Sequence, residues 1–173
     1  MNKQFWLLDC TLRDGGYYHN WDFSNELVND YLETMSEVGV DCVELGFRSF
    51  QVKDFKGPTW YTTESYLSGL SIPKNLIIGV MVNASELISH PLGISKATKL
   101  MFKRAKKSKV KLVRLACHFE EFKATCKICN ILQKMGYLVT INLMQISEQT
   151  EEKIDTFLQN TKNTLMKKSI KII

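Results

Sequence analysis

Charged and small residues gather near the N-terminus, where the segment Leu7 to Asn20 reads LLDCTLRDGGYYHN. An apolar strand that ends in charged residues and a glycine turn commonly forms a binding site at the C-terminal edge of a sheet. Gly15 and Gly16 can adopt backbone angles that other residues avoid. Arg13 places a permanent cation beside Asp14, whose carboxylate suits a hard divalent metal ion. The pattern therefore predicts a ligand or metal site, and a surface ion pair on a turn is the alternative.

Further charged residues lie inside apolar segments. Because side chains alternate across a strand, Asp9, Thr11 and Arg13 are expected on one face of the first strand. In the same way, Glu44 and Arg114 oppose the apolar residues beside them. Buried charges are costly unless they are paired. We therefore expect Asp9, Glu44 and Arg114 to converge inside a barrel, either as a site or as a structural ion-pair network beneath one.

The elements that position these residues alternate between strand and helix. Ser24 is a suitable helix N-cap, and Gly39 and Gly136 are suitable helix ends. We predict later strands at 42–47, 76–82, 111–117 and 137–144, and helices at 25–38, 85–105 (with a turn near 90–91), 119–135 and 151–165. In the second strand, Val43, Leu45 and Phe47 are expected on the helix-covered face. Residues 166–173 could start a further strand with the character of a sheet edge. Strand–helix units of about 30 residues fit either an eight-unit barrel or an open doubly wound sheet.

Composition indicates one globular domain over residues 1–173, with 45% apolar and 24% charged residues. No apolar run approaches a membrane span, and the N-terminus does not resemble a signal peptide, so we expect a cytoplasmic protein. The five cysteines show no disulfide pattern. Cys126 and Cys129 have the spacing of a redox or zinc pair, but both fall on the apolar side of a predicted helix and are expected to be buried thiols.

A basic segment carries much of the net charge of +5: residues 96–111 hold eight lysines and arginines and no acid. Such a cluster can bind nucleic acid. Leu100, Met101 and Phe102 give the predicted helix an apolar side, and no recognised nucleic-acid motif accompanies the charge. We interpret the segment as a solvated helix face, with nucleic-acid binding as the alternative.

The N-terminal phrase resembles the signature of the DRE-TIM metallolyases, a superfamily that includes 4-hydroxy-2-oxoacid aldolases and hydroxymethylglutaryl-CoA lyases. In that family the first barrel strand ends in D-x-T-L-R-D-G, which matches Asp9, Thr11, Leu12, Arg13, Asp14 and Gly15. The segments VELGF at 43–47, VRLACH at 113–118 and INLMQIS at 141–147 are similar to later family segments. The resemblance extends from Leu7 to about Leu165 and implies a (β/α)8 TIM barrel truncated to about its first five units.

The resemblance also implies a function: metal-dependent cleavage or formation of a carbon–carbon bond through the enolate of a pyruvate-type 2-oxo acid. Asp14 would bind Mn²⁺ or Mg²⁺, and Arg13 would stabilise the enolate oxygen. Glu44 matches an acid that supports the site, and His118 matches a histidine at the end of the fourth strand. The expected binding partner is a small 2-oxo acid substrate, and binding to a membrane or to nucleic acid is not expected.

Two departures from the family pattern limit this assignment. The His-x-His pair that completes the metal site in the family has no counterpart here, which leaves one carboxylate ligand. The catalytic histidine of the aldolase branch is replaced by Tyr17, and His19 is the nearest substitute. A homo-oligomer or a separate C-terminal half could complete the barrel. The alternative is a catalytically inactive barrel fragment with a structural or interaction role.

Overall fold

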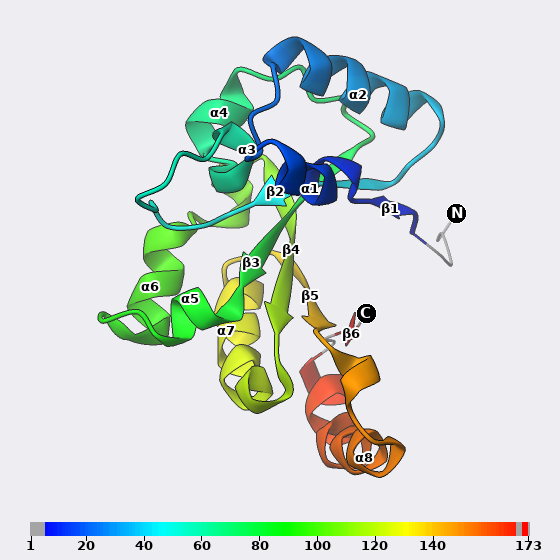
Figure 1. The fold of residues 1–173 in the computed structure, drawn as a ribbon, viewed down its shortest axis with the longest axis vertical. Helices are drawn as coiled ribbons and strands as arrows, with labels where there is room; N and C mark the ends of the chain where they lie inside the picture. Colours follow the sequence, from blue (N-terminus) through cyan, green and yellow to red (C-terminus); the bar gives the residue numbers. More distant parts are fainter. Residues whose placement is uncertain (1–5, 169–170, 173) are drawn as a thin grey trace.

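A curled sheet of parallel strands organises the structure, a computed structural model that describes residues 6–168 and 171–172. Its strands are β1 (Leu8–Asp9), β2 (Cys42–Phe47), β3 (Ile77–Asn83), β4 (Val110–Cys117), β5 (Leu138–Leu143) and β6 (Lys171–Ile172). Each strand pairs in parallel with the next in chain order. A doubly wound sheet would reverse its strand order near the middle. The unreversed order instead makes this sheet part of a TIM-like barrel (Figure 1).

Helices connect the strands along the outside of this curled sheet (Figure 1). The α-helices are α1 (Thr11–Gly15), α2 (Asn25–Glu37), α3 (Pro58–Tyr61), α4 (Glu64–Ser68), α5 (Ala84–Ile88), α6 (Gly93–Met101), α7 (Phe122–Lys134) and α8 (Glu151–Lys168). Short 3-10 turns are η1 (Gly16–Tyr18), η2 (Ala105–Lys107), η3 (Phe119–Glu121) and η4 (Ile146–Glu148). Among the described residues, no helix combines the length and apolar character that crossing a membrane requires.

The ends of α2 and α7 follow the sequence signals. The Ser24 hydroxyl accepts a hydrogen bond from the Leu27 backbone N–H at 3.2 Å, which caps α2. Gly39 and Gly136 come just after α2 and α7 with φ of +82° and +94°. Glycine suits these positions because other residues avoid a positive φ.

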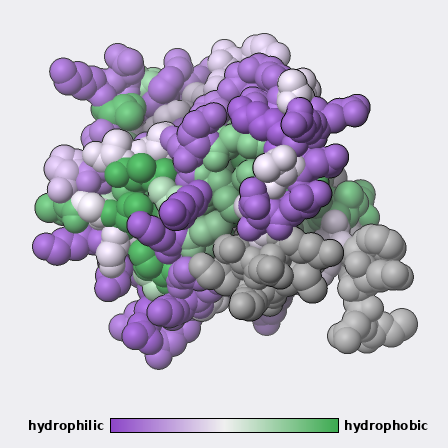
Figure 2. All heavy atoms as spheres, turned by 90° about the horizontal axis from the view of Figure 1, so that it is seen from below, coloured by the Kyte–Doolittle hydropathy of each residue, from purple (hydrophilic) through white to green (hydrophobic). Residues whose placement is uncertain are grey.

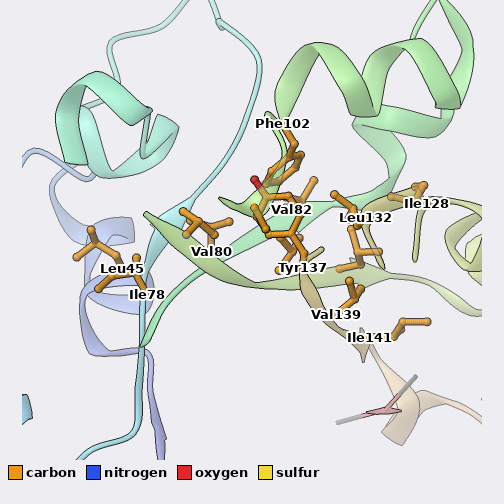
Figure 3. Packing of buried hydrophobic residues seen from close by; sticks show 14 of the residues in the cluster. Leu45, Ile78, Val80, Val82, Phe102, Ile128, Leu132, Tyr137, Val139 and Ile141 are labelled. Atoms are coloured by element: carbon orange, nitrogen blue, oxygen red, sulfur yellow. The ribbon is translucent and has the colours of Figure 1, made fainter. Parts of the chain in front are cut away.

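The main core fills the space between the sheet and the helices. Figure 3 shows Val80 and Val82 of β3 and Val139 and Ile141 of β5 packed with Leu132 of α7. These strand residues lie two apart because alternate side chains of a strand share a face. Cys126 and Cys129 are buried in the same core, which confirms the prediction of buried thiols.

A bulge in β2 overturns one prediction. In the pairing with β3, Glu44 lies opposite Gly79 and Gly46 lies opposite Val80, so Leu45 is an extra residue. Such a bulge reverses the face of each residue that follows it. Phe47 therefore belongs to a second cluster, with Met81 and Ala116, on the inner face of the sheet rather than under the helices.

The first edge strand differs from expectation, whereas the last agrees with it. The first strand is shorter than expected: β1 has two residues, both partly buried, and within the described chain it has a strand partner on one side only. At the other edge, β6 pairs with β5 at residues 171–172, which agrees with the prediction that residues 166–173 could start a further strand and adds a sixth strand to the five expected units. The predictions for residues 1–5, 169–170 and 173 lie outside the described residues.

The surface mixes polar and apolar side chains. Figure 2 shows the face seen from below in Figure 1, where an apolar area is bordered by hydrophilic residues. Scattered exposed residues such as Leu100 and Leu158 contribute apolar surface elsewhere in the described chain. Much of the surface of any folded domain is apolar, so this mixture needs no special explanation.

A buried arginine ties the long β2–β3 connection to the start of β4. The Arg48 guanidinium donates to Glu64 Oε1 at 2.9 Å and to the Thr62 carbonyl, and it lies over the Phe102 ring. Ser108 Oγ also donates to Glu64 Oε1, at 2.6 Å. Burial alone would raise the pKa of Glu64, but the hydrogen bonds from Ser108 and Arg48 outweigh this effect and lower it.

The substitution Glu64→Gln should lower the free energy of unfolding at pH 7 by about 1–2 kcal/mol, because charge-assisted hydrogen bonds are lost. The pKa of the Glu64 carboxyl is lower in the folded state than in the unfolded state. Its contribution to the free energy of unfolding is therefore fully present above the unfolded-state pKa and is lost as pH falls through the folded-state pKa. Urea denaturation at pH 7 and near pH 3 measures the difference in free energy of unfolding between the wild type and Glu64→Gln. Glu33→Gln, on the exposed face of α2, is the control. A wild-type advantage that persists undiminished near pH 3 would contradict the assignment.

Candidate functional site

Glu44 on the inner face of β2 is the centre of the candidate site. Its side chain is fully buried. Glu44 Oε1 accepts a hydrogen bond from Arg13 Nε at 2.8 Å, and Arg114 Nη1 lies 3.0 Å from both carboxylate oxygens. Burial raises the pKa of Glu44, while Arg114 and Arg13 act in the opposite direction. The structure thus brings together two of the three charges predicted to converge, and adds Arg13.

Asp9, the third residue of that prediction, does not join the cluster. It accepts hydrogen bonds from the Thr11 backbone N–H at 2.9 Å and from the Thr11 hydroxyl at 3.0 Å. The Tyr31 hydroxyl of α2 also donates to it. Asp9 therefore links the first residue of α1 to α2 through hydrogen bonds. The predicted common face of Asp9, Thr11 and Arg13 is wrong because the chain leaves the strand after Asp9 and becomes helical.

The two glycines of the motif have a different role from the one predicted. Gly15 and Gly16 have helical φ angles of −60° and −57°, which any residue can adopt. A Cβ atom on Gly16 would overlap the Trp21 indole ring, whereas one on Gly15 would meet only Phe23 at 3.9 Å. Gly16 is required by close packing, and the expected glycine turn is a helical turn.

The motif places Arg13 between two carboxylates. Its Nε contacts Glu44, and its Nη1 contacts Asp14. Among the described residues, its Nη2 makes no hydrogen bond. The Arg13 backbone carbonyl accepts a hydrogen bond from Trp21 Nε1 at 2.9 Å. The guanidinium is therefore fixed in direction and keeps one nitrogen available to an anionic ligand.

Asp14 is more exposed than the buried cluster, with 57% of its side chain accessible. It lines an open pocket of about 740 Å³ beside β1, together with Cys10, Tyr17 and Tyr18. Cys10 Sγ donates to Asp14 Oδ2 at 3.3 Å. Burial and the Asp14 carboxylate both raise the pKa of the Cys10 thiol. Asp14 is thus an accessible carboxylate at the edge of the site.

An aromatic cluster that sequence reasoning missed covers the inner face beside Arg13. Trp21 packs against Trp60 at 4.5 Å and Phe47 at 5.6 Å between ring centroids, and Tyr17 lies 4.7 Å from Trp21. Lys56 Nζ lies over Trp21 and Trp60 at 5.3 and 5.5 Å. Aromatic residues at 17, 18 and 21 were the available signal, but Lys56 and Trp60 come from the β2–β3 connection, where Trp60 belongs to α3. The cluster shields Arg13 from solvent.

The histidines do not enter the cluster. His19 is exposed and packs its ring on Phe23, with 4.1 Å between ring centroids. His118 is exposed at the end of β4, where its backbone N–H donates to Glu121 Oε2 at 3.0 Å and begins η3. Of the candidates for proton transfer, only Tyr17 lines the pocket of Asp14. No group of three histidine, cysteine or acidic side chains that could hold a metal ion occurs among the described residues.

The chain has a likeness among solved structures. No family model and no curated protein match the chain. Among solved structures, the chain is similar to the N-terminal domain of a "putative aldolase" from Bacteroides vulgatus, at 30% sequence identity and a TM-score of 0.70. The match covers 89% of this chain and 48% of that chain, so this chain spans about half the length of its structural relative. The chain therefore has an aldolase-like, partial-barrel fold.

The substitution Gly16→Ala should lower the free energy of unfolding by about 1–3 kcal/mol, because the added methyl group must displace the Trp21 ring. Gly15→Ala is the matched control and should be neutral or stabilising by up to about 1 kcal/mol, since alanine favours a helix and the space is open. Urea denaturation followed by tryptophan fluorescence measures both. Equal effects of the two substitutions would contradict the packing role of Gly16.

Proposed function

We propose that the chain carries part of the active site of a metal-dependent aldolase or lyase that acts through the enolate of a pyruvate-type 2-oxo acid. The observation that carries the proposal is the fixed Arg13, which lies between buried Glu44 and accessible Asp14. The likeness to a domain described as an aldolase supports the same class of reaction.

Arg13 would stabilise the charge that develops on the enolate oxygen. Removal of a proton next to the carbonyl leaves negative charge on that oxygen, and a donor already oriented toward it lowers the barrier. Glu44 holds Nε, so the guanidinium does not need to reorient during the reaction. Arg114 shares Glu44 and limits its movement. In this proposal Glu44 positions Arg13 without contacting the substrate, and Arg114 Nη1 helps to hold Glu44 in place.

The inner face also offers hydrogen bonds to the substrate. Arg114 Nε and Thr140 Oγ1 are buried and have no partner among the described residues. The two residues are neighbours in the pairing of β4 with β5. Buried polar atoms normally have a hydrogen-bond partner. A carboxylate of a 2-oxo acid is a suitable partner for both donors.

The metal ion of this proposal would bind at Asp14. Asp14 supplies one accessible carboxylate oxygen donor, which suits Mg²⁺ or Mn²⁺. The described residues supply no group of three potential ligands, so they do not fit a complete site by themselves. Further ligands would have to come from a second polypeptide or from residues outside the described part. Tyr17 is the proton-transfer group in this proposal because it lines the same pocket, whereas His19 and His118 do not. Its phenol would protonate the enolate carbon, and in the reverse step its phenolate would accept the proton from the methyl group.

Enolate formation can be measured without knowing the second substrate. In the presence of Mg²⁺, the chain should accelerate exchange of the pyruvate methyl protons in D₂O. Proton NMR measures the rate of this exchange. Arg13→Lys should reduce the exchange rate by about 100-fold, because lysine lacks the planar fork that binds Glu44 and Asp14 together. His19→Gln is the control and should leave the rate unchanged. Exchange at the buffer rate with the wild-type chain would refute the proposal for this chain.

Binding of Mg²⁺ at Asp14 can be followed through Cys10, the least buried of the cysteines. Burial raises the pKa of Cys42 to about 12 and that of Cys117 to about 11, so these buried thiols should not react near pH 8. Asp14→Asn should lower the pKa of Cys10 and speed its alkylation several-fold. Mg²⁺ should have the same effect on the wild-type chain and none on Asp14→Asn. If Mg²⁺ changed the rate of Cys10 alkylation equally in the wild-type chain and in Asp14→Asn, Asp14 would be excluded as the ligand.

A further inference from the structure

A second pocket lies between α6 and α7, at the end of the sheet where β4 and β5 begin. Its volume is about 570 Å³. Phe102, Ile131 and Met135 give it apolar lining, and three cations, Lys99, Arg104 and Lys134, also line it. Arg13 and Asp14 follow the end of β1, so this pocket is separate from the candidate active site.

The three cations carry charge that no acidic residue of the pocket lining balances. Among the described residues, Lys99, Arg104 and Lys134 make no ion pair or side-chain hydrogen bond, and no acidic residue lines the pocket. Nearby Lys111 is different, because its Nζ donates to the Ala105 and Ser108 carbonyls at 2.7 and 2.8 Å. Lys111 has a structural role, whereas the pocket cations remain available to a ligand.

Stabilisation of helix ends is the simplest alternative explanation, since Lys99 and Lys134 lie in the last turns of α6 and α7. The last carbonyls of α7, however, already accept backbone hydrogen bonds. Met135 N donates to the Ile131 carbonyl at 3.0 Å, and Gly136 N to the Gln133 carbonyl at 2.9 Å. Arg104 belongs to neither helix. Helix capping therefore does not account for the convergence of the three charges.

We propose that this pocket binds a small organic phosphate, a ligand with a phosphate or diphosphate group and an aromatic or apolar body. Lysine and arginine bind phosphate oxygens through charge-assisted hydrogen bonds. The partly exposed side chains of Ile131 and Met135 offer apolar surface to the rest of the ligand, above the buried Phe102 ring. The Ser95 hydroxyl is an additional hydrogen-bonding group in the lining. A nucleoside diphosphate has this combination of charge and aromatic surface.

Isothermal titration of the intact chain with ADP tests the proposal, with pyrophosphate and adenosine as separate ligands. ADP should bind about tenfold more tightly than either part, because it uses both the cations and the apolar lining. The double substitution Arg104→Gln with Lys134→Gln should weaken ADP binding by about tenfold or more. The matched control is Lys74→Gln with Lys123→Gln, which removes the same charge from exposed positions outside the pocket lining. The control should change the affinity less than twofold.

Several outcomes would overturn the proposal. Equal weakening by the two double variants would show a general effect of net charge. Pyrophosphate binding as tightly as ADP would exclude a role for the apolar lining. A single-stranded oligonucleotide that binds more tightly than ADP, and loses affinity in the pocket variant, would assign the surface to nucleic acid instead. Circular dichroism and the thermal midpoint of each variant establish that a lost affinity does not come from unfolding. If the pocket variant does not fold, Lys99→Gln alone should weaken ADP binding in a folded chain.

Discussion

The buried carboxylate of Glu44 is the constraint on which the inner face of the sheet depends. A fully buried charge is tolerated only when it is paired and hydrogen bonded, and Glu44 meets this condition through Arg13 and Arg114. These partners come from α1 and β4 and are separated in sequence by about 100 residues. The ion-pair cluster therefore fixes the N-terminal motif against the middle of the sheet. The same contact orients the guanidinium for an anionic ligand.

The aromatic cluster completes that arrangement. Trp21 contacts the Arg13 carbonyl with its indole N–H and leaves no room for a side chain at position 16. Phe47 reaches this cluster only because the bulge at Leu45 changes its face. An apolar environment excludes water, so the electrostatic interactions of the few polar groups inside it are screened less and are stronger. The open pocket beside Asp14 lies at the edge of this shielded region.

The two candidate pockets of the partial barrel differ in the elements that form them. The first adjoins the motif that follows β1, whose outer edge has no strand partner in the described chain. The second is formed between consecutive helices and is complete within the described residues. The reaction proposed at the first site needs metal ligands beyond those that the described residues supply. Binding at the second pocket does not require them.

The sequence by itself determined the strand–helix alternation, the parallel sheet, the helix ends at Gly39 and Gly136, and the pairing of Glu44 with Arg114, because hydrophobic period, caps and buried charge are local or strongly restrictive signals. The resemblance of the N-terminal motif to an aldolase family agreed with the fold found. Only the tertiary structure decided the face of Phe47, the separation of Asp9 from the cluster and the contribution of Trp60. A single bulge, a helical turn and the short helix α3 in the β2–β3 connection set these positions, and none has a periodic signature. Which side chains meet across the sheet depends on register and packing, and these are properties of the whole chain.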